Sequence, residues 1–270
     1  PLKGIILYRG PAIPNSHVLN TLLSKTSVSI FGLSPFTLRL PNVIFALVFF
    51  WNAAWLSKNL KTLWAQVCAF IILSSHVYFF DFFALSRGYG MALALLMASI
   101  HHLYLYFKVE NGNHTYRTII FAGLAVYANF SFLYFYLALM VTMPLMAYAD
   151  GVTSRKTWWQ LIRALVIVSA FLGALIFVPL RQISKVLFGG FNTFWPDTVH
   201  TLLQRMLYQN DFSWVLSISF IVAGVIILAL VLLIVDGFIN KGHNRFFYQP
   251  LFLVLALTAV FQILQHHILD

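Results

Sequence analysis

Residues 17–41 read HVLNTLLSKTSVSIFGLSPFTLRLP, and the organisation of the whole chain follows from this stretch. At helical spacing one face is polar and the opposite face is apolar; the polar set is His17, Asn20, Thr21 and Ser24, and the apolar set is Val18, Leu19, Leu22 and Leu23. Asn15 or Ser16 is expected to cap the helix start. The pattern predicts a short amphipathic helix over His17–Ser27, lying on the membrane surface with its polar face toward water. A surface anchor whose polar stripe is merely solvated is the alternative.

The composition places the chain among polytopic membrane proteins with an all-α fold. Of its 270 residues, 61% are hydrophobic and 9% are charged, whereas soluble domains are about half apolar and a quarter charged. The net charge of +10 fits anionic lipid head groups, a phosphate-bearing substrate or ordinary cytoplasmic loop charge. The single cysteine, Cys68, excludes an internal disulfide.

Apolar runs predict seven or eight membrane spans, since crossing the hydrocarbon core takes about 20 residues. The runs lie near 40–57, 62–80, 88–107, 118–149, 159–180, 213–235 and 248–265. The run 118–149 is too long for one untilted helix, and it contains Asn129 and Ser131 near its middle. We therefore expect two short helices that meet there.

Loop charge predicts the orientation of these spans. If 118–149 crosses twice, one side of the membrane receives Lys58, Lys61, Lys108, Arg117, Arg155, Lys156, Lys241 and Arg245, and this side is cytoplasmic by the positive-inside rule. His101 and His102 are expected in the interface on this side. The extracytoplasmic side receives loop 1–39, the Asp81–Arg87 turn, loop 181–212 and the C terminus.

The chemistry-bearing residues nearest the predicted outer surface are Asp81, Arg87 and His17. Asp81 and Arg87 flank the mouth between two spans, and Gly88 and Gly90 permit a bend that would bring them together. They are either functional groups or an interfacial ion pair that orients the helices. His17 is a candidate ligand for a metal or for phosphate, although one imidazole does not make a metal site.

Two groups of short motifs carry a resemblance to a known family. The first comprises His17-Val18-Leu19, Phe31-Gly32 and Leu38-Arg39-Leu40-Pro41, and the second is DFFALSRGYG at 81–90. In this order and at span ends, they resemble the GT-C class of polytopic membrane glycosyltransferases. They are similar in particular to the dolichyl-phosphate-mannose protein mannosyltransferases and the bacterial lipid A aminoarabinose transferases. The resemblance covers residues 15–91, and beyond them it rests on hydropathy.

The resemblance implies transfer of a sugar from a polyprenyl-phosphate donor to a lipid, glycan or protein acceptor on the extracytoplasmic face. In this family the usual base is an acidic residue soon after the first span, but here no Asp or Glu precedes Asp81. Asp81 acts as the base, or the base lies upstream of Pro1, or the chain is inactive as given. The chain has no initiator Met and no hydrophobic span before residue 40. We therefore expect a fragment that lacks the first span and a C-terminal part.

The resemblance also assigns roles to individual side chains. The donor phosphate and lipid are expected at Arg87, Tyr89, Arg181 and Lys185, catalysis at Asp81 and His17, and acceptor or lining positions at Asn20, His266 and His267. No cofactor is assigned, and a divalent metal is left open. Partners are the lipid-linked donor, the acceptor and membrane lipids, without nucleic acid, and the expected location is a bacterial inner membrane with the site facing the periplasm or exterior.

Two other classes of function are compatible with the residues. A transporter or flippase would use Asp81 and Arg87 as a gate, and it should show broken helices in corresponding halves of the chain. The sequence shows no such symmetry. A purely structural membrane subunit is the third class.

Overall fold

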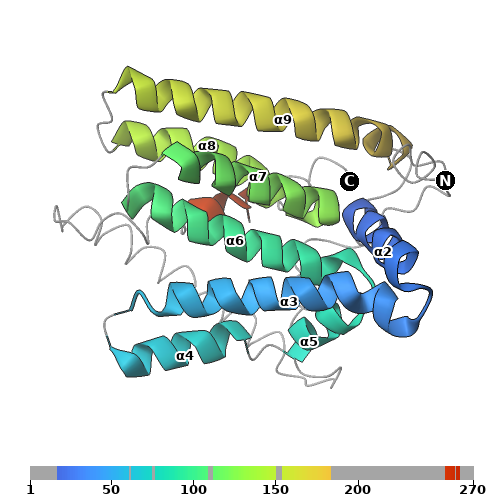
Figure 1. Ribbon diagram of the computed structural model, residues 1–270. Coiled ribbons are helices and arrows are strands. Elements are labelled where there is room, and N and C mark those ends of the chain that lie inside the picture. The colour runs from blue at the N-terminus through green and yellow to red at the C-terminus, as the bar shows by residue number, and fades with distance from the viewer. Residues whose placement is uncertain are drawn as a thin grey trace, which may run out of the picture. The chain divides into compact units, whose positions relative to one another are not determined.

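The computed structural model describes residues 17–60, 62–74, 77–108, 112–149, 154–183, 253–258 and 260–261, and their regular elements are all helical (Figure 1). Contacts divide the chain into two compact units, 1–184 and 185–270. The first unit holds the helices described below. The predicted span 213–235 and most of 248–265 lie outside the described residues.

The stretch 17–41 forms two separate helices, α2 (Val18–Phe31) and α3 (Pro35–Ser57). Gly32 ends α2 with a φ of 80°, a conformation that glycine adopts without steric strain. α2 is thus a helix of its own and not part of a span, as predicted. The expected cap at Asn15 or Ser16 is wrong, because His17 occupies the N-cap position and makes no side-chain capping bond.

Among the described residues, four helices are long and apolar enough to cross a membrane, and this supports a membrane protein. They are Pro35–Ser57, Gly88–Lys108, Phe130–Tyr148 and Arg155–Phe177. They correspond to α3, α6 (Gly88–Lys108), η1 with α8 (Phe130–Phe132 and Leu133–Ala149), and α9 (Arg155–Ile183). α3 already begins at Pro35, inside the predicted loop 1–39. α9 continues to Ile183, so Arg181 belongs to a helix and not to the predicted loop 181–212.

The long run 118–149 is divided as the sequence predicts. α7 (Gly112–Ala128) ends directly before Asn129, and the short helix η1 leads into α8. Asn129 is extended, and its side-chain oxygen accepts a hydrogen bond from the backbone N–H of Ser131 at 3.0 Å. An asparagine side chain that bonds the local backbone in this way starts a new helix and ends the old one.

The predicted span 62–80 contains two described helices, and whether they cross the membrane in series stays a prediction. The segment forms α4 (Leu63–Ser74, 12 residues) and α5 (Val77–Ala84, 8 residues). At 1.5 Å per residue neither helix reaches across a core of about 30 Å.

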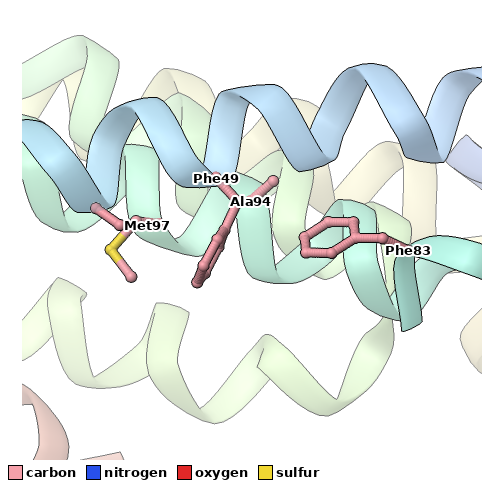
Figure 2. Packing of buried hydrophobic residues seen from close by; sticks show 5 residues of the cluster. Phe49, Phe83, Ala94 and Met97 are labelled. Atoms are coloured by element: carbon pink, nitrogen blue, oxygen red, sulfur yellow. The ribbon is translucent and has the colours of Figure 1, made fainter. Parts of the chain in front are cut away.

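Within the first unit, α6 packs between α3 and α7, and α7 also packs against α9 (Figure 1). One apolar cluster joins α3, α5 and α6; it consists of Phe49, Ala53, Phe83, Ala94 and Met97. Figure 2 shows Phe49 of α3 lying among Phe83, Ala94 and Met97, and the Phe49 and Phe83 ring centroids are 5.7 Å apart. Because Phe83 is anchored near the end of α5, the following turn 85–87 is held at the end of the bundle where α2 lies.

Candidate functional site

The polar face of α2 points into the protein and not toward water, contrary to the prediction. Asn20 is 4% exposed, and Ser24 and Ser27 are also buried, while Thr21 is exposed. These buried side chains donate to backbone carbonyls of neighbouring elements. The sequence pattern predicted that Asn20 and Ser24 share a face but assigned that face to the wrong surroundings; Thr21 of the predicted polar set is exposed, and Val18 of the predicted apolar set is buried.

A pair of asparagines ties α2 and α3 to the turn between α5 and α6. Asn20 donates through Nδ2 to the carbonyl of Ser86 at 3.1 Å. The Nδ2 atom of Asn42 lies 3.1 Å from Asn20 Oδ1, 2.7 Å from the Leu85 carbonyl oxygen and 3.0 Å from the Arg87 carbonyl oxygen. Because α5 ends at Ala84, carbonyls in this turn lack helical donors, and the amides supply them. Asn42 is 0% exposed.

Pro41 explains why the Arg-Leu-Pro segment receives α2. A proline inside a helix has no N–H for the carbonyl four residues earlier, which here is Thr37. Ser27 Oγ donates to that carbonyl at 2.7 Å. One residue further along, the Leu38 carbonyl accepts from the hydroxyls of Ser24 at 3.1 Å and Ser86 at 3.0 Å. The motif thus presents accessible carbonyls that match the serines of α2.

Gly88 allows three segments to meet at one point. His17 Nδ1 lies 3.0 Å from the Ala128 carbonyl, and its ring contacts Tyr89 edge-on at 4.7 Å between centroids. A Cβ at Gly88 would lie 2.7 Å from His17 Nδ1 and would also clash with the Ala128 carbonyl oxygen. Only glycine fits between the start of α2 and the end of α7. The bend that the sequence analysis attributed to this residue is a close approach.

His17 is a neutral imidazole at pH 7. Burial lowers its pKa from the ordinary 6.5, the bond to Ala128 opposes this effect, and the positive charge of Arg87 lowers the pKa further. Since a carbonyl oxygen only accepts, Nδ1 carries the proton and Nε2 is left as the acceptor. The lone pair of Nε2 can accept a hydrogen bond or a proton from a bound hydroxyl.

The structure brings some of the predicted site residues together. His17, Asn20, Tyr89 and the backbone of Arg87 belong to one connected set of contacts, and the Arg87 side chain is exposed beside them. Asp81 is exposed on α5, and within the described part of the chain no ion pair joins it to Arg87. Lys185, His266, His267 and the Arg181 side chain lie outside the described residues, so their roles stay predictions.

The described residues do not fit a divalent metal. In this part of the chain no three or more His, Cys, Asp or Glu side chains are placed to hold an ion. The cluster around His17 offers one imidazole, backbone carbonyls and a nearby cation, which is a poor environment for Zn²⁺ or Mg²⁺.

The histidines near the opposite end of α6 make contacts within the bundle, and their predicted position at the membrane interface stays a prediction. His101 is buried, bonds through Nδ1 to Asn52 Oδ1 at 2.6 Å and stacks on Trp55 at 3.8 Å. His102 Nδ1 lies 3.2 Å from His114 Nδ1. The polar Asn52 on α3 makes the burial of His101 possible, because it gives a buried imidazole N–H an acceptor.

Sequence reasoning missed Asn42, Ser27, Ser86 and the Ala128 carbonyl. Asn42 carried a usable signal, since an amide within a predicted span needs partners in the protein. The Ala128 carbonyl carried none, because its role depends on where α7 ends in space.

Comparison with known proteins supplies no family for this site. No protein-family model, curated protein or solved structure matches the chain.

Proposed function

We propose that the chain belongs to a membrane glycosyltransferase that moves a sugar from a polyprenyl-phosphate donor to an acceptor hydroxyl on the extracytoplasmic face. One observation carries the proposal: the two motif-bearing segments, 17–42 and 85–89, join at one end of the bundle and leave Arg87 exposed beside a neutral His17. The motif resemblance supplies the reaction, and the seven or eight spans remain part of the proposal.

The reaction needs a group that holds phosphate and a group that takes a proton. The acceptor oxygen bonds to the anomeric carbon of the sugar, the bond from that carbon to the phosphate oxygen breaks, and the phosphate keeps the electron pair. Arg87 offers a guanidinium that can bind two phosphate oxygens at once. Tyr89 lies half-buried next to it. The proton of the acceptor goes to Asp81 or to Nε2 of His17.

The α2 end of the bundle is the extracytoplasmic end in this proposal. Lys108 donates to Asn59 at 3.3 Å, which places the ends of α3 and α6 together at the opposite side. Lys58 lies at that end as well, and such cations are typical of cytoplasmic loops. Cysteines introduced at Asn113 and Asp197 should be labelled from opposite sides of the membrane, and identical labelling would contradict the orientation.

A transporter or flippase is the second candidate. The observation that favours it is that the described residues of 63–84 form two short helices, α4 and α5, since discontinuous helices often line substrate sites in transporters. A flippase would move the lipid-linked sugar across the bilayer without breaking its bond to phosphate.

The deciding experiment uses the full chain in liposomes with radiolabelled undecaprenyl- or dolichyl-phosphate sugars. Loss of a charge-assisted contact of about 1.5–3 kcal/mol predicts that Arg87→Ala weakens donor binding about 10- to 150-fold. Arg87→Lys should recover part of the loss because lysine lacks the two-pronged guanidinium. Arg163→Ala is the matched control, an exposed arginine on α9 that contacts Trp159.

Two results would overturn the proposal. If Arg87→Ala folds normally and binds and transfers like Arg163→Ala, the guanidinium has no role in donor binding. If the labelled sugar crosses the bilayer and stays on its lipid, the chain is a flippase.

A further inference from the structure

We propose that the turn between α2 and α3 is a membrane-inserted element, whose apolar side chains lie among the lipids at the boundary between head groups and acyl chains. Four large side chains in and beside this turn are exposed: Ile30 66%, Phe31 64%, Leu33 79% and Phe36 64%. We call them the apolar turn. Four neighbouring exposed hydrophobic side chains mark an interaction surface. The inference does not depend on the sugar-transfer reaction.

Several backbone groups of the apolar turn form hydrogen bonds within the turn, as an apolar environment requires. The Gly32 N–H donates to the Val28 carbonyl at 2.9 Å, and the Gly32 carbonyl accepts from Thr37 Oγ1 at 2.8 Å. Ser34 and Thr37 bond reciprocally, with Ser34 N to Thr37 Oγ1 at 3.0 Å and Thr37 N to Ser34 Oγ at 3.1 Å. Because these groups bond within the turn, they keep their hydrogen-bond partners when the turn leaves water.

The turn also continues the apolar outer surface of α3. Phe36 shares a helical face with the exposed side chains of Ile44, Leu47 and Trp51, which follow it at helical spacing along a candidate span. From Phe36 to Ser57 the helix rises about 31 Å, close to the thickness of about 30 Å of a hydrocarbon core. A bilayer that covers α3 therefore reaches the apolar turn at its boundary.

The charged side chains beside the apolar turn indicate that lipid covers it. Lys25 on α2 and Arg39 on α3 are exposed on either side of the turn in the sequence, and no Asp or Glu occurs before Asp81. Cations beside exposed apolar residues match anionic lipid head groups above acyl chains.

The test measures the surroundings of single spin labels on the full chain in liposomes that contain anionic lipid. Cys68, the only cysteine, is first replaced by alanine. Phe31→Cys and Leu33→Cys then carry the label, and Thr21→Cys is the control because Thr21 is exposed on the same helix away from the turn. We expect the ratio of oxygen to nickel-chelate accessibility to be several-fold higher at 31 and 33 than at 21.

Two outcomes would overturn the inference. Equal ratios at 21, 31 and 33 would mean that the turn lies in water. Protection of 31 and 33 from both reagents would mean that a protein surface, such as a second copy of the chain, covers the turn. Circular dichroism of each labelled variant checks its helix content. An unfolded variant is therefore not mistaken for a folded one whose turn lies in water.

Discussion

Replacing Asn42 by alanine tests whether the buried amide holds the candidate site together. Asn42 has two amide protons, and three oxygens lie within 3.1 Å of its Nδ2: Asn20 Oδ1 and the carbonyls of Leu85 and Arg87. Its own Oδ1 is buried without a hydrogen-bond partner among the described residues. The substitution therefore removes two donors and one unpaired acceptor at the same time.

These effects have opposite signs and can be weighed. Interhelical hydrogen bonds in membrane proteins contribute about 0.6 and up to about 1.7 kcal/mol each, so two lost donors destabilise by about 1–3 kcal/mol. A void of some tens of Å³ adds about 1 kcal/mol. Removing an unpaired buried acceptor returns about 1 kcal/mol. The free energy of unfolding should fall by about 1–3 kcal/mol, the balance of these three contributions.

The assay is reversible unfolding in mixed detergent micelles, followed by circular dichroism. Asn42→Asp is the sharper variant, since it keeps the volume and the unpaired oxygen but loses both protons and adds a charge, so it should be less stable than Asn42→Ala. Asn59→Ala is the matched control, because Asn59 is exposed and water can replace its bonds. The reasoning is refuted if Asn42→Ala unfolds like Asn59→Ala, or if Asn42→Asp is as stable as the parent.

Three further predictions use the same unfolding assay. Gly88→Ala should lower the free energy of unfolding by about 3 kcal/mol, because the new Cβ would be overpacked against backbone. Gly173→Ala is the control; a Cβ there has nothing within 4 Å, so this variant should be neutral or slightly stabilised. Equal effects of the two substitutions would contradict the close approach at Gly88. Ser27→Ala should lower the free energy of unfolding by about 0.6–1.7 kcal/mol in the parent protein. The loss should be smaller in a Pro41→Ala background, because the restored N–H of residue 41 then donates to the Thr37 carbonyl. A double-mutant cycle that shows no coupling between the two substitutions would contradict this account. Folding lowers the pKa of His17 below 6.5, so the unfolded chain binds more protons than the folded chain at acidic pH. The free energy of unfolding should therefore fall as the pH drops below 6.5. It should fall less steeply in His17→Asn, and the slopes of the two proteins against pH measure the difference.

Several features of the fold could be predicted from the sequence because they depend on short segments. Hydropathy and composition are sufficient for an all-helical membrane protein, since only helices or closed barrels satisfy their backbone bonds in lipid. The division of 118–149 at Asn129 follows from the preference of that side chain for bonding the local backbone. In 62–80 the apolar run gave no sign that α4 ends at Ser74 and that α5 begins at Val77, because hydropathy does not show where a helix stops.

The position of α2 could be decided only by the tertiary structure. Helical periodicity shows that Asn20, Ser24 and Ser27 share a face, but not whether that face meets water or protein. The answer depends on backbone carbonyls that lie opposite those side chains: Thr37, which lacks a helical donor because of Pro41, Leu38 on α3, and Ser86 in the turn after α5. An amphipathic pattern is a property of one helix, whereas a partner for its polar face exists only where two other segments end or break beside it in space.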